Sequence, residues 1–217
     1  MPRCLPATPA TMPEVLREAV AVLRQGGVVA YPTDTVYGLA VDATDVGAIA
    51  RLYRVKGRLD AKALPLIIGD VGQLAEVAAA VPPQAEKLMA AFWPGPLTLL
   101  LEPHEALPAE LRGESPRIGV RWPAARLCQQ LACGLGHAIT ATSANCSGAP
   151  AALTAAAVAD QLGVSVDLIL DGGRAESSEV STVLDVVVEP PCIRRPGKIP
   201  AQVIEAALGG PVSMGPM

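Results

Sequence analysis

The 217-residue sequence has few aromatic side chains and few histidines. It contains two Trp, three Tyr and one Phe, whereas a domain that stacks successive bases on aromatic rings needs more of them. The formal net charge of -4 points the same way, because non-specific affinity for nucleic acid depends on a positive surface. With only His104 and His137, a catalytic zinc site with three histidine ligands is excluded. We therefore expect little direct binding of RNA.

Paired cysteines, nucleotide-binding glycine motifs and long apolar runs are also missing. The five cysteines form no C-x-x-C pair, which is typical of reduced thiols rather than of a disulfide framework or a zinc site. Gly197-Lys198 is followed by Ile199, so there is no P-loop, and no G-x-S-x-G elbow is present. No apolar run approaches the roughly 20 residues of a membrane span, and the first residues do not begin a secretory signal. We expect a cytoplasmic protein that does not associate with membranes.

Short apolar runs alternate with amphipathic segments along the whole chain, which predicts an α/β fold. Several connections are too short for helical crossovers, so we expect a single domain with a twisted mixed sheet flanked by helices. The domain is expected over residues 10–209, with tails at 1–9 and 210–217. Thr11 and Glu14 have the spacing of a capping box at the first helix, which closes before Gly26. The expected helices after it cover 46–56, 71–79, 84–91, 124–132, 154–162 and 201–208, and the expected strands cover 28–31, 64–68, 97–101, 118–121, 138–141, 166–170 and 182–188.

Polar residues follow several of these strands. The segment 31–39 places threonine hydroxyls directly after a buried strand. It is either an ordinary turn or part of a ligand site. The segment 56–62 holds three cations in seven residues. Such a run is usually a solvated face, yet Gly57 lets the backbone bend so that the cations can converge on a polyphosphate. Phe92 and Trp93 are expected to cap the core.

An arginine at the end of a buried strand also requires explanation. Arg121 needs an anionic partner, either a carboxylate of the protein or one of a ligand. The segment 140–148 is rich in small hydroxyl and amide side chains that allow a ligand to approach the backbone. Ser181 begins another strand, and Arg195 ends one. Together these segments predict a pocket of hydroxyls and cations without a thiol, a metal cluster or a histidine base.

Seven segments of the sequence, in order, resemble the YrdC family, the threonylcarbamoyl-AMP synthases that begin the t6A modification of tRNA. The resemblance runs from about Glu14 to Leu208. The sequence is similar to the single-domain form of the family. The matching segments are Pro32 to Leu39, Lys56-x-Arg58-x-x-x-Lys62, Trp93 to Thr98, Val120-Arg121-x-Pro123, Ser143-Ala144-Asn145-x-Ser147-Gly148, Ser181 to Val183 and Arg195 to Gly197.

The resemblance implies a nucleotidyltransferase that combines L-threonine, bicarbonate and ATP, with Mg²⁺, into threonylcarbamoyl-AMP and pyrophosphate. A tRNA threonylcarbamoyl transferase would then receive the product. Because the substrates supply the nucleophiles, such an enzyme works mainly by positioning and charge neutralisation. Two other readings stay open: a non-catalytic RNA-binding or ribosome-maturation protein of the same fold, and a carbamoyl-transfer domain of the hydrogenase-maturation type.

Site residues follow from the same resemblance. It implies catalytic roles for Lys56 and Arg58; contacts to ATP from Arg58, Lys62, Ser143, Asn145 and Arg195; and contacts to L-threonine from Thr35, Arg121, Thr142 and Ser181. The metal ligands are not indicated. The segment 174–180 would be a lid over a labile mixed anhydride. Three positions depart from the family pattern: Ile67 where some relatives carry a histidine that contacts threonine, Ala63 after the last lysine, and Ala151 in place of a serine.

We predict that Arg58→Ala weakens ATP binding and leaves the fold intact, because an exposed cation contributes little to stability. Titration calorimetry with ATP, together with urea unfolding, measures both quantities. Wild-type affinity for ATP in this variant would refute the assignment.

Overall fold

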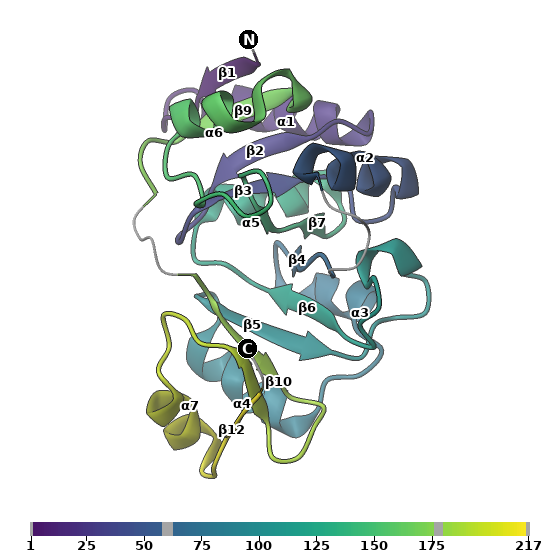
Figure 1. Ribbon diagram of the computed structural model, residues 1–217, viewed down its shortest axis with the longest axis vertical. Helices are drawn as coiled ribbons and strands as arrows, with labels where there is room; N and C mark the ends of the chain where they lie inside the picture. Colours follow the sequence, from purple (N-terminus) through teal and green to yellow (C-terminus); the bar gives the residue numbers. More distant parts are fainter. Residues whose placement is uncertain (1, 58–62, 176–179, 216–217) are drawn as a thin grey trace.

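The computed structural model describes residues 2–57, 63–175 and 180–215 (Figure 1). The α-helices of these residues are α1 (Met12–Arg24), α2 (Val46–Lys56), α3 (Leu74–Val77), α4 (Pro83–Phe92), α5 (Arg126–Leu135), α6 (Ala155–Leu162) and α7 (Ala201–Leu208). The strands are β1 (Arg3–Pro6), β2 (Val29–Pro32), β3 (Tyr37–Ala40), β4 (Leu66–Ile67), β5 (Leu97–Leu101), β6 (Ile118–Arg121), β7 (Ile139–Thr140), β8 (Thr142–Ser143), β9 (Leu168–Asp171), β10 (Thr182–Asp185), β11 (Cys192–Arg195) and β12 (Ser213–Met214).

The strands form a five-stranded sheet with the order β1-β9-β2-β3-β8 and a seven-stranded sheet with the order β12-β11-β10-β5-β6-β4-β7. Each sheet contains parallel and antiparallel pairs, such as β2 beside β9 and β2 beside β3. In Figure 1, β1, β9, β2 and β3 lie in the upper half of the molecule and β5, β6 and β10 in the lower half. The predicted α/β class with mixed sheet pairing is confirmed.

The two sheets meet along the segment 138–143. Gly38 pairs with Ser143 and Leu39 with Thr142 in the first sheet, and the isolated bridge between Asp42 and Ile139 continues the same antiparallel register. The same Ile139 pairs with Ile67 of β4 in the second sheet. One short segment thus joins both sheets into a strongly twisted surface and sets the β2–β3 hairpin against the ends of β4 and β6.

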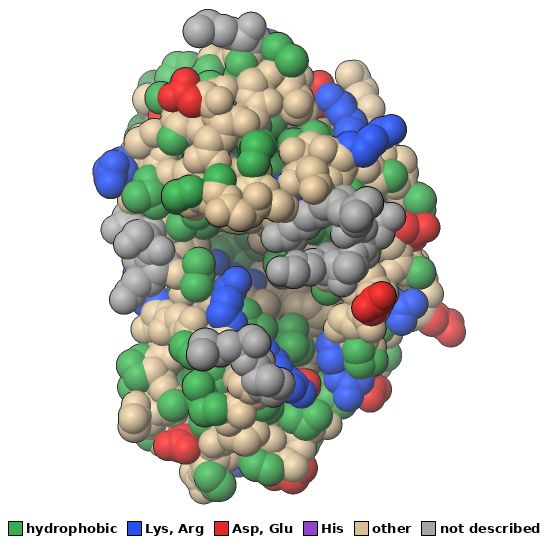
Figure 2. Space-filling model, viewed as in Figure 1, with side chains coloured by type: hydrophobic (Ala, Val, Ile, Leu, Met, Phe, Trp, Pro, Cys, Tyr) green, Lys and Arg blue, Asp and Glu red, His purple; other side chains and the backbone are tan. Residues whose placement is uncertain are grey.

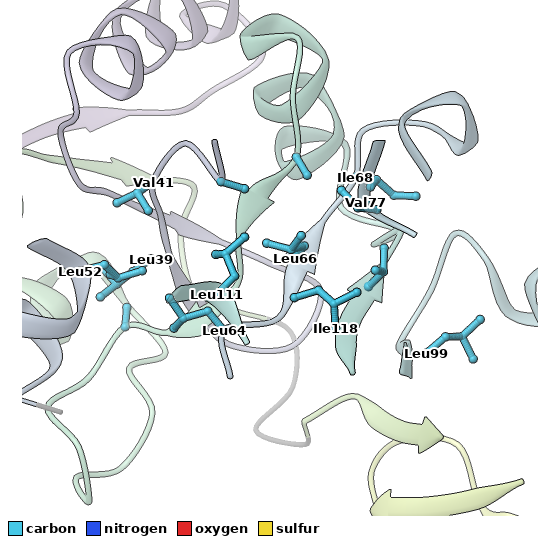
Figure 3. Close-up of a cluster of buried hydrophobic side chains, with 14 of the residues drawn as sticks. Leu39, Val41, Leu52, Leu64, Leu66, Ile68, Val77, Leu99, Leu111 and Ile118 are labelled. Atoms are coloured by element: carbon cyan, nitrogen blue, oxygen red, sulfur yellow. The ribbon is translucent and has the colours of Figure 1, made fainter. Parts of the chain in front are cut away.

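Aliphatic side chains fill the core on both faces of this surface. Figure 3 shows Leu39 of β3 beside Leu52 of α2, and Leu66 of β4 near Ile118 of β6, all four with no exposed area. A second cluster lies where α1 and α5 cover the first sheet, around Leu23 and Leu131. Each such aliphatic side chain stabilises the fold by about 1.5–3 kcal/mol on burial, so the two clusters hold the hairpin and β6 in fixed relative positions.

Several details differ from the sequence-based expectations. The predicted capping box is wrong: the Thr11 hydroxyl accepts no hydrogen bond from the first turn of α1 and instead accepts from the backbone N–H of Thr8 and donates to the carbonyl of Pro6 in the preceding loop. β3 was not expected, and β1 and β12 lie in the segments expected as tails. The expected helix 71–79 is a 3₁₀ turn followed by the four-residue α3. Trp93 caps the core as expected, since it is 8% exposed and donates to the carbonyl of Leu97.

Helix α2 has clear signals at both ends. The Asp45 carboxylate accepts a hydrogen bond from the backbone N–H of Ala48, as an N-cap residue does. Gly57 ends the helix with φ at +61°, a left-handed conformation that glycine adopts without strain. Lys56 is therefore the last residue of a helix whose end is fixed, and its side chain has a defined origin.

Close backbone packing explains another motif glycine. A Cβ atom on Gly197 would lie 2.5 Å from the carbonyl carbon of Ser181 and from the backbone nitrogen of Thr182. Only a residue without a side chain allows the segment after β11 to approach the start of β10 this closely. This contact sets the position of Ser181.

We predict that Gly197→Ala lowers the free energy of unfolding by roughly 1–3 kcal/mol, because backbone atoms must shift to admit the methyl group. Urea unfolding measures the change. Gly210→Ala is the matched control: a Cβ there meets nothing within 4 Å, so its stability should stay within about 0.5 kcal/mol of wild type. Equal stability of the two variants would contradict the packing argument.

Candidate functional site

A cleft lies where the β2–β3 hairpin faces the ends of β5, β6, β10 and β11. It consists of two adjoining cavities of 390 and 240 Å³, and we call them together the central cleft. Figure 2 shows a hollow across the middle of this face, with Lys and Arg side chains inside it. Both cavities are lined by Ala63, Pro65, Arg121, Ala141, Ser181 and Arg195.

Arg121 ends β6 and is 6% exposed. Its Nε donates to the carbonyl of Gly95 at 2.9 Å, and one terminal nitrogen donates to the Asp34 carboxylate. The other terminal nitrogen lies 3.4 Å from the Thr35 hydroxyl. Of the two anionic partners that the sequence left open, the structure provides the protein carboxylate. Since a guanidinium has five N–H donors, two of them remain for a ligand.

The turn between β2 and β3 holds Thr35 in place. The Thr33 backbone N–H and hydroxyl both donate to the carbonyl of Val36, at 3.2 and 2.7 Å. The Thr35 backbone N–H then donates to the Thr33 hydroxyl at 3.0 Å. This segment is both a tight turn and a wall of the central cleft, so its two possible readings are compatible.

Ser181 and Arg195 form the opposite wall. The Ser181 and Thr98 hydroxyls are 2.8 Å apart, and Arg195 donates to the carbonyl and the hydroxyl of Ser181 at 2.8 and 2.9 Å. Burial of the Arg195 guanidinium lowers its pKa, and the positive charge of Arg121 lowers it further. Two guanidinium groups therefore face one cavity, and an anionic ligand would relieve their repulsion.

A small cavity of 40 Å³ extends the cleft beneath the hairpin. Thr35, Arg121, Thr142 and Ser143 line it, and the buried Ile67 closes it with an aliphatic wall. The two other departures from the family pattern, Ala63 and Ala151, line the 390 Å³ cavity. All three departures therefore change the shape of the candidate site and remove no cation from it.

Lys56 does not line the cleft cavities. Its ammonium group is buried and donates to the carbonyl of Ser143 at 2.5 Å and to the carbonyl and side-chain oxygens of Asn145 at 2.6 and 3.1 Å. The Asn145 amide in turn donates to the carbonyls of Cys146 and Ala149. Lys56 and Asn145 thus hold the loop that carries Ser143 in place, and the direct substrate contacts expected for them remain predictions.

The structure brings most of the expected site residues to one place. Those that line the 390 Å³ cavity are Thr35, Arg121, Thr142, Ser143, Ser181 and Arg195. Arg58 and Lys62 lie outside the described residues. Asp34 and Thr98 were missed; Asp34 stands inside a matching segment, but only the fold shows that it meets Arg121.

The expected lid segment is described only in part, because residues 176–179 lie outside the described residues. The residue just before it is tied to the hairpin: the Tyr37 hydroxyl donates to the carbonyl of Gly173 at 2.7 Å. Burial and the nearby Asp171 carboxylate raise the pKa of Tyr37 to about 12, so the phenol stays protonated and keeps donating at neutral pH. The lid role remains a prediction.

Three further features concern metal ligands, cysteines and membrane-spanning helices. Among the residues that the structure describes, no three His, Cys, Asp or Glu side chains gather where they could hold a metal ion. The five cysteines are free thiols. Within the same residues, no helix has both the length and the apolar character needed to cross a membrane.

A larger cavity of 660 Å³ lies between α1 and α5. Leu16, Val20 and Ala21 form much of its wall, with Arg17 and Arg24 beside them. It contains none of the hydroxyl-bearing residues that distinguish the central cleft. A polar, anionic substrate therefore fits the central cleft better, although that cleft is smaller.

Comparisons with known proteins agree with this fold. The model of the Sua5_yciO_yrdC family, described as "Telomere recombination", matches residues 21–197, and the chain belongs to this family. The threonylcarbamoyl-AMP synthase of Pyrococcus abyssi is 38% identical over 194 residues, which are 89% of this chain and 57% of that protein. The threonylcarbamoyl-AMP synthase of Chromohalobacter salexigens is 39% identical over 171 residues, covering 79% of this chain and 92% of that protein.

A solved structure of a relative has the same fold. The crystal structure of P. abyssi Sua5 complexed with L-threonine superimposes with a TM-score of 0.93 at 35% sequence identity and covers 100% of this chain and 63% of that one. The chain thus spans less than two thirds of the length of this relative. The likeness nevertheless includes the whole of the central cleft.

We predict that Lys56→Met lowers the free energy of unfolding by roughly 1–3 kcal/mol, because the oxygens of Ser143 and Asn145 lose their buried donor. Urea unfolding measures the change. Lys87→Met, at an exposed position of α4, is the matched control and should stay within about 0.5 kcal/mol of wild type. Lys56→Met with the stability of the control would show that the ammonium does not hold the loop.

Proposed function

We propose that the chain is a threonylcarbamoyl-AMP synthase, which forms threonylcarbamoyl-AMP and pyrophosphate from L-threonine, bicarbonate and ATP. The observation that carries this proposal is the 390 Å³ cavity, which collects four hydroxyls and two guanidinium groups from segments far apart in the sequence. The names of the two synthases that the chain resembles support it, as does the L-threonine in the P. abyssi structure.

The reaction needs positioning more than it needs an enzyme nucleophile. The threonine amine attacks carbon dioxide and loses a proton, or attacks bicarbonate, whose C–O bond breaks to release water; either route gives a carbamate. A carbamate oxygen then attacks the α-phosphorus of ATP, and pyrophosphate leaves with the electron pair of the broken P–O bond. Because the substrates supply both nucleophiles, the protein contributes orientation and charge neutralisation. A cleft of hydroxyls and cations provides both.

Arg121 is the group best placed for the threonine carboxylate. Its two remaining N–H donors match a carboxylate, and the Thr35 hydroxyl lies beside it at 3.4 Å. Thr142 and Ser181 supply further hydroxyls for the amino acid from the same cavity. In this account the amino acid lies beneath the hairpin, with the ATP phosphates toward Arg195 and Ser143.

The phosphate site extends beyond the described residues. Gly57 turns the chain out of α2, and Arg58 and Lys62 follow it as proposed phosphate contacts. Lys56 and Asn145 support this region by holding the Ser143 loop. We assign both as positioning residues of the synthase.

Mg²⁺ is proposed to enter as the MgATP complex. This cation commonly binds to substrate phosphates with one or two carboxylates and keeps several waters, so it does not require a three-carboxylate cage. The product is a mixed anhydride, which calls for rapid consumption by a transferase that acts on tRNA. That partner and a cytoplasmic location remain predictions.

The alternative of a non-catalytic RNA-binding or ribosome-maturation protein is less favoured. Such a protein would be expected to lose the site groups and to carry a basic face. This chain keeps the lined cleft and has a net charge of -4. A hydrogenase-maturation carbamoyl-transfer domain is not supported by any separate feature of the cleft.

We predict that the purified protein, given ATP, Mg²⁺ and bicarbonate, releases pyrophosphate with L-threonine and not with other amino acids. A coupled pyrophosphate assay over the individual amino acids measures this. Omission of bicarbonate is the control and should abolish the signal, since no carbamate can form. Absence of pyrophosphate with every amino acid would overturn the proposed activity.

A further inference from the structure

We propose that Asp34 is a positioning residue: it fixes the plane of the Arg121 guanidinium so that the two remaining donors of Arg121 face the carboxylate of the amino-acid substrate. Only the identity of that substrate rests on the proposed function. The fixed guanidinium itself follows from contacts within the chain.

The ion pair between Asp34 and Arg121 is nearly closed off from solvent. The Arg121 side chain is 7% exposed and the Asp34 side chain 11%. Arg121 lines the 390 and 240 Å³ cavities, whereas Asp34 lines neither of them. Asp34 therefore contacts the guanidinium from outside these cavities and acts on a ligand through Arg121.

Three acceptors from two separate segments hold the same guanidinium. The Gly95 carbonyl, in the turn before β5, accepts from Nε, and Asp34 and Thr35 of the hairpin accept from the two terminal nitrogens. A planar guanidinium that is hydrogen-bonded at all three nitrogens cannot rotate about its Cδ–Nε bond. Because bidentate binding of a carboxylate depends on the direction of two parallel N–H bonds, this restraint prepares Arg121 for its ligand.

Charge alone predicts the opposite effect. Arg121 and Arg195 face the same cavity, and the charge of Arg121 lowers the pKa of Arg195. If Asp34 acted only by offsetting one positive charge, its removal would make the cavity more attractive to anions and would tighten carboxylate binding. If Asp34 positions Arg121, its removal weakens carboxylate binding despite the added positive charge.

Two substitutions separate these roles. Asp34→Asn removes the charge but keeps a side-chain oxygen that can accept from Arg121, whereas Asp34→Ala removes both. Asp185→Asn is the matched control: its carboxylate, 5% exposed, pairs with Arg194 at 2.9 Å and lines neither cleft cavity. The control reports the general cost of neutralising a buried carboxylate that pairs with an arginine outside the cleft.

The experiment uses the full chain and two measurements. The first is the hydrogen-exchange rate of the Arg121 Nε–H, followed by NMR without any ligand. The second is the KM for L-threonine and the KM for ATP in the pyrophosphate assay. We expect Asp34→Ala to speed the exchange and to raise the KM for L-threonine by about tenfold or more, as loss of a charge-assisted contact does. The KM for ATP should stay within about twofold.

The conservative and control variants complete the test. Asp34→Asn should keep slow exchange and a threonine KM within about threefold of wild type, since the acceptor remains. Asp185→Asn should change neither the exchange rate of the Arg121 Nε–H nor the KM for L-threonine. A lower threonine KM in both Asp34 variants, or unchanged exchange and KM in Asp34→Ala, would overturn the proposal.

Failure of the proposed function is distinguishable from failure of this inference. If the wild-type protein releases no pyrophosphate, the activity is wrong, and the exchange of the Arg121 Nε–H still decides the role of Asp34. Faster exchange in Asp34→Ala alone would then support positioning, and equal exchange in all variants would refute it.

Discussion

The buried guanidinium of Arg121 is the group on which the central cleft depends. A charge at the end of a buried strand is costly unless it is paired and hydrogen-bonded, and the chain meets that requirement with three groups from two segments. The hairpin supplies Asp34 and Thr35, and the turn before β5 supplies the carbonyl of Gly95. The same contacts that make the charge tolerable bring the walls of the cleft together. The contacts of Arg121 therefore stabilise the fold and shape the cleft at the same time.

A second buried cation has a comparable effect on the neighbouring loop. The Lys56 ammonium draws three oxygens of the segment 143–145 toward the end of α2. Arg195, by contrast, lies at the cavity wall with its charge directed at the space that a ligand would fill. In a chain with a net charge of -4, part of the positive charge thus holds the loop and the hairpin in place and part lines the cavity. This division explains how a protein with a negative net charge can have a cleft lined by cations.

The sequence predicted the regular elements well where local signals were strong. β5, β6, α2 and α7 have the expected bounds, because continuous apolar runs or amphipathic periodicity with clear end signals mark them. β8 and β12 have two residues each, too few for a periodic pattern to emerge, and a glycine inside β3 weakens its strand pattern. They form because neighbouring strands offer open hydrogen-bonding edges, and that is a property of the tertiary fold.

The site was predictable as a set of residue types and only partly as a set of contacts. The motif segments identified the side chains that line the cleft, since hydroxyls and cations follow buried strands. They did not show that Asp34 pairs with Arg121, or that Lys56 is enclosed by the Ser143 loop, because both contacts join segments more than 80 positions apart.

The central claim is that L-threonine binds in the central cleft, with its carboxylate at Arg121. The most direct test is an NMR titration of the isotope-labelled protein with L-threonine, which follows backbone amides and the Arg121 side chain together. The account predicts that the largest chemical-shift changes occur at Thr35, Arg121 and Ser181. Chemical-shift changes confined to the cavity between α1 and α5, with Arg121 unaffected, would contradict the account.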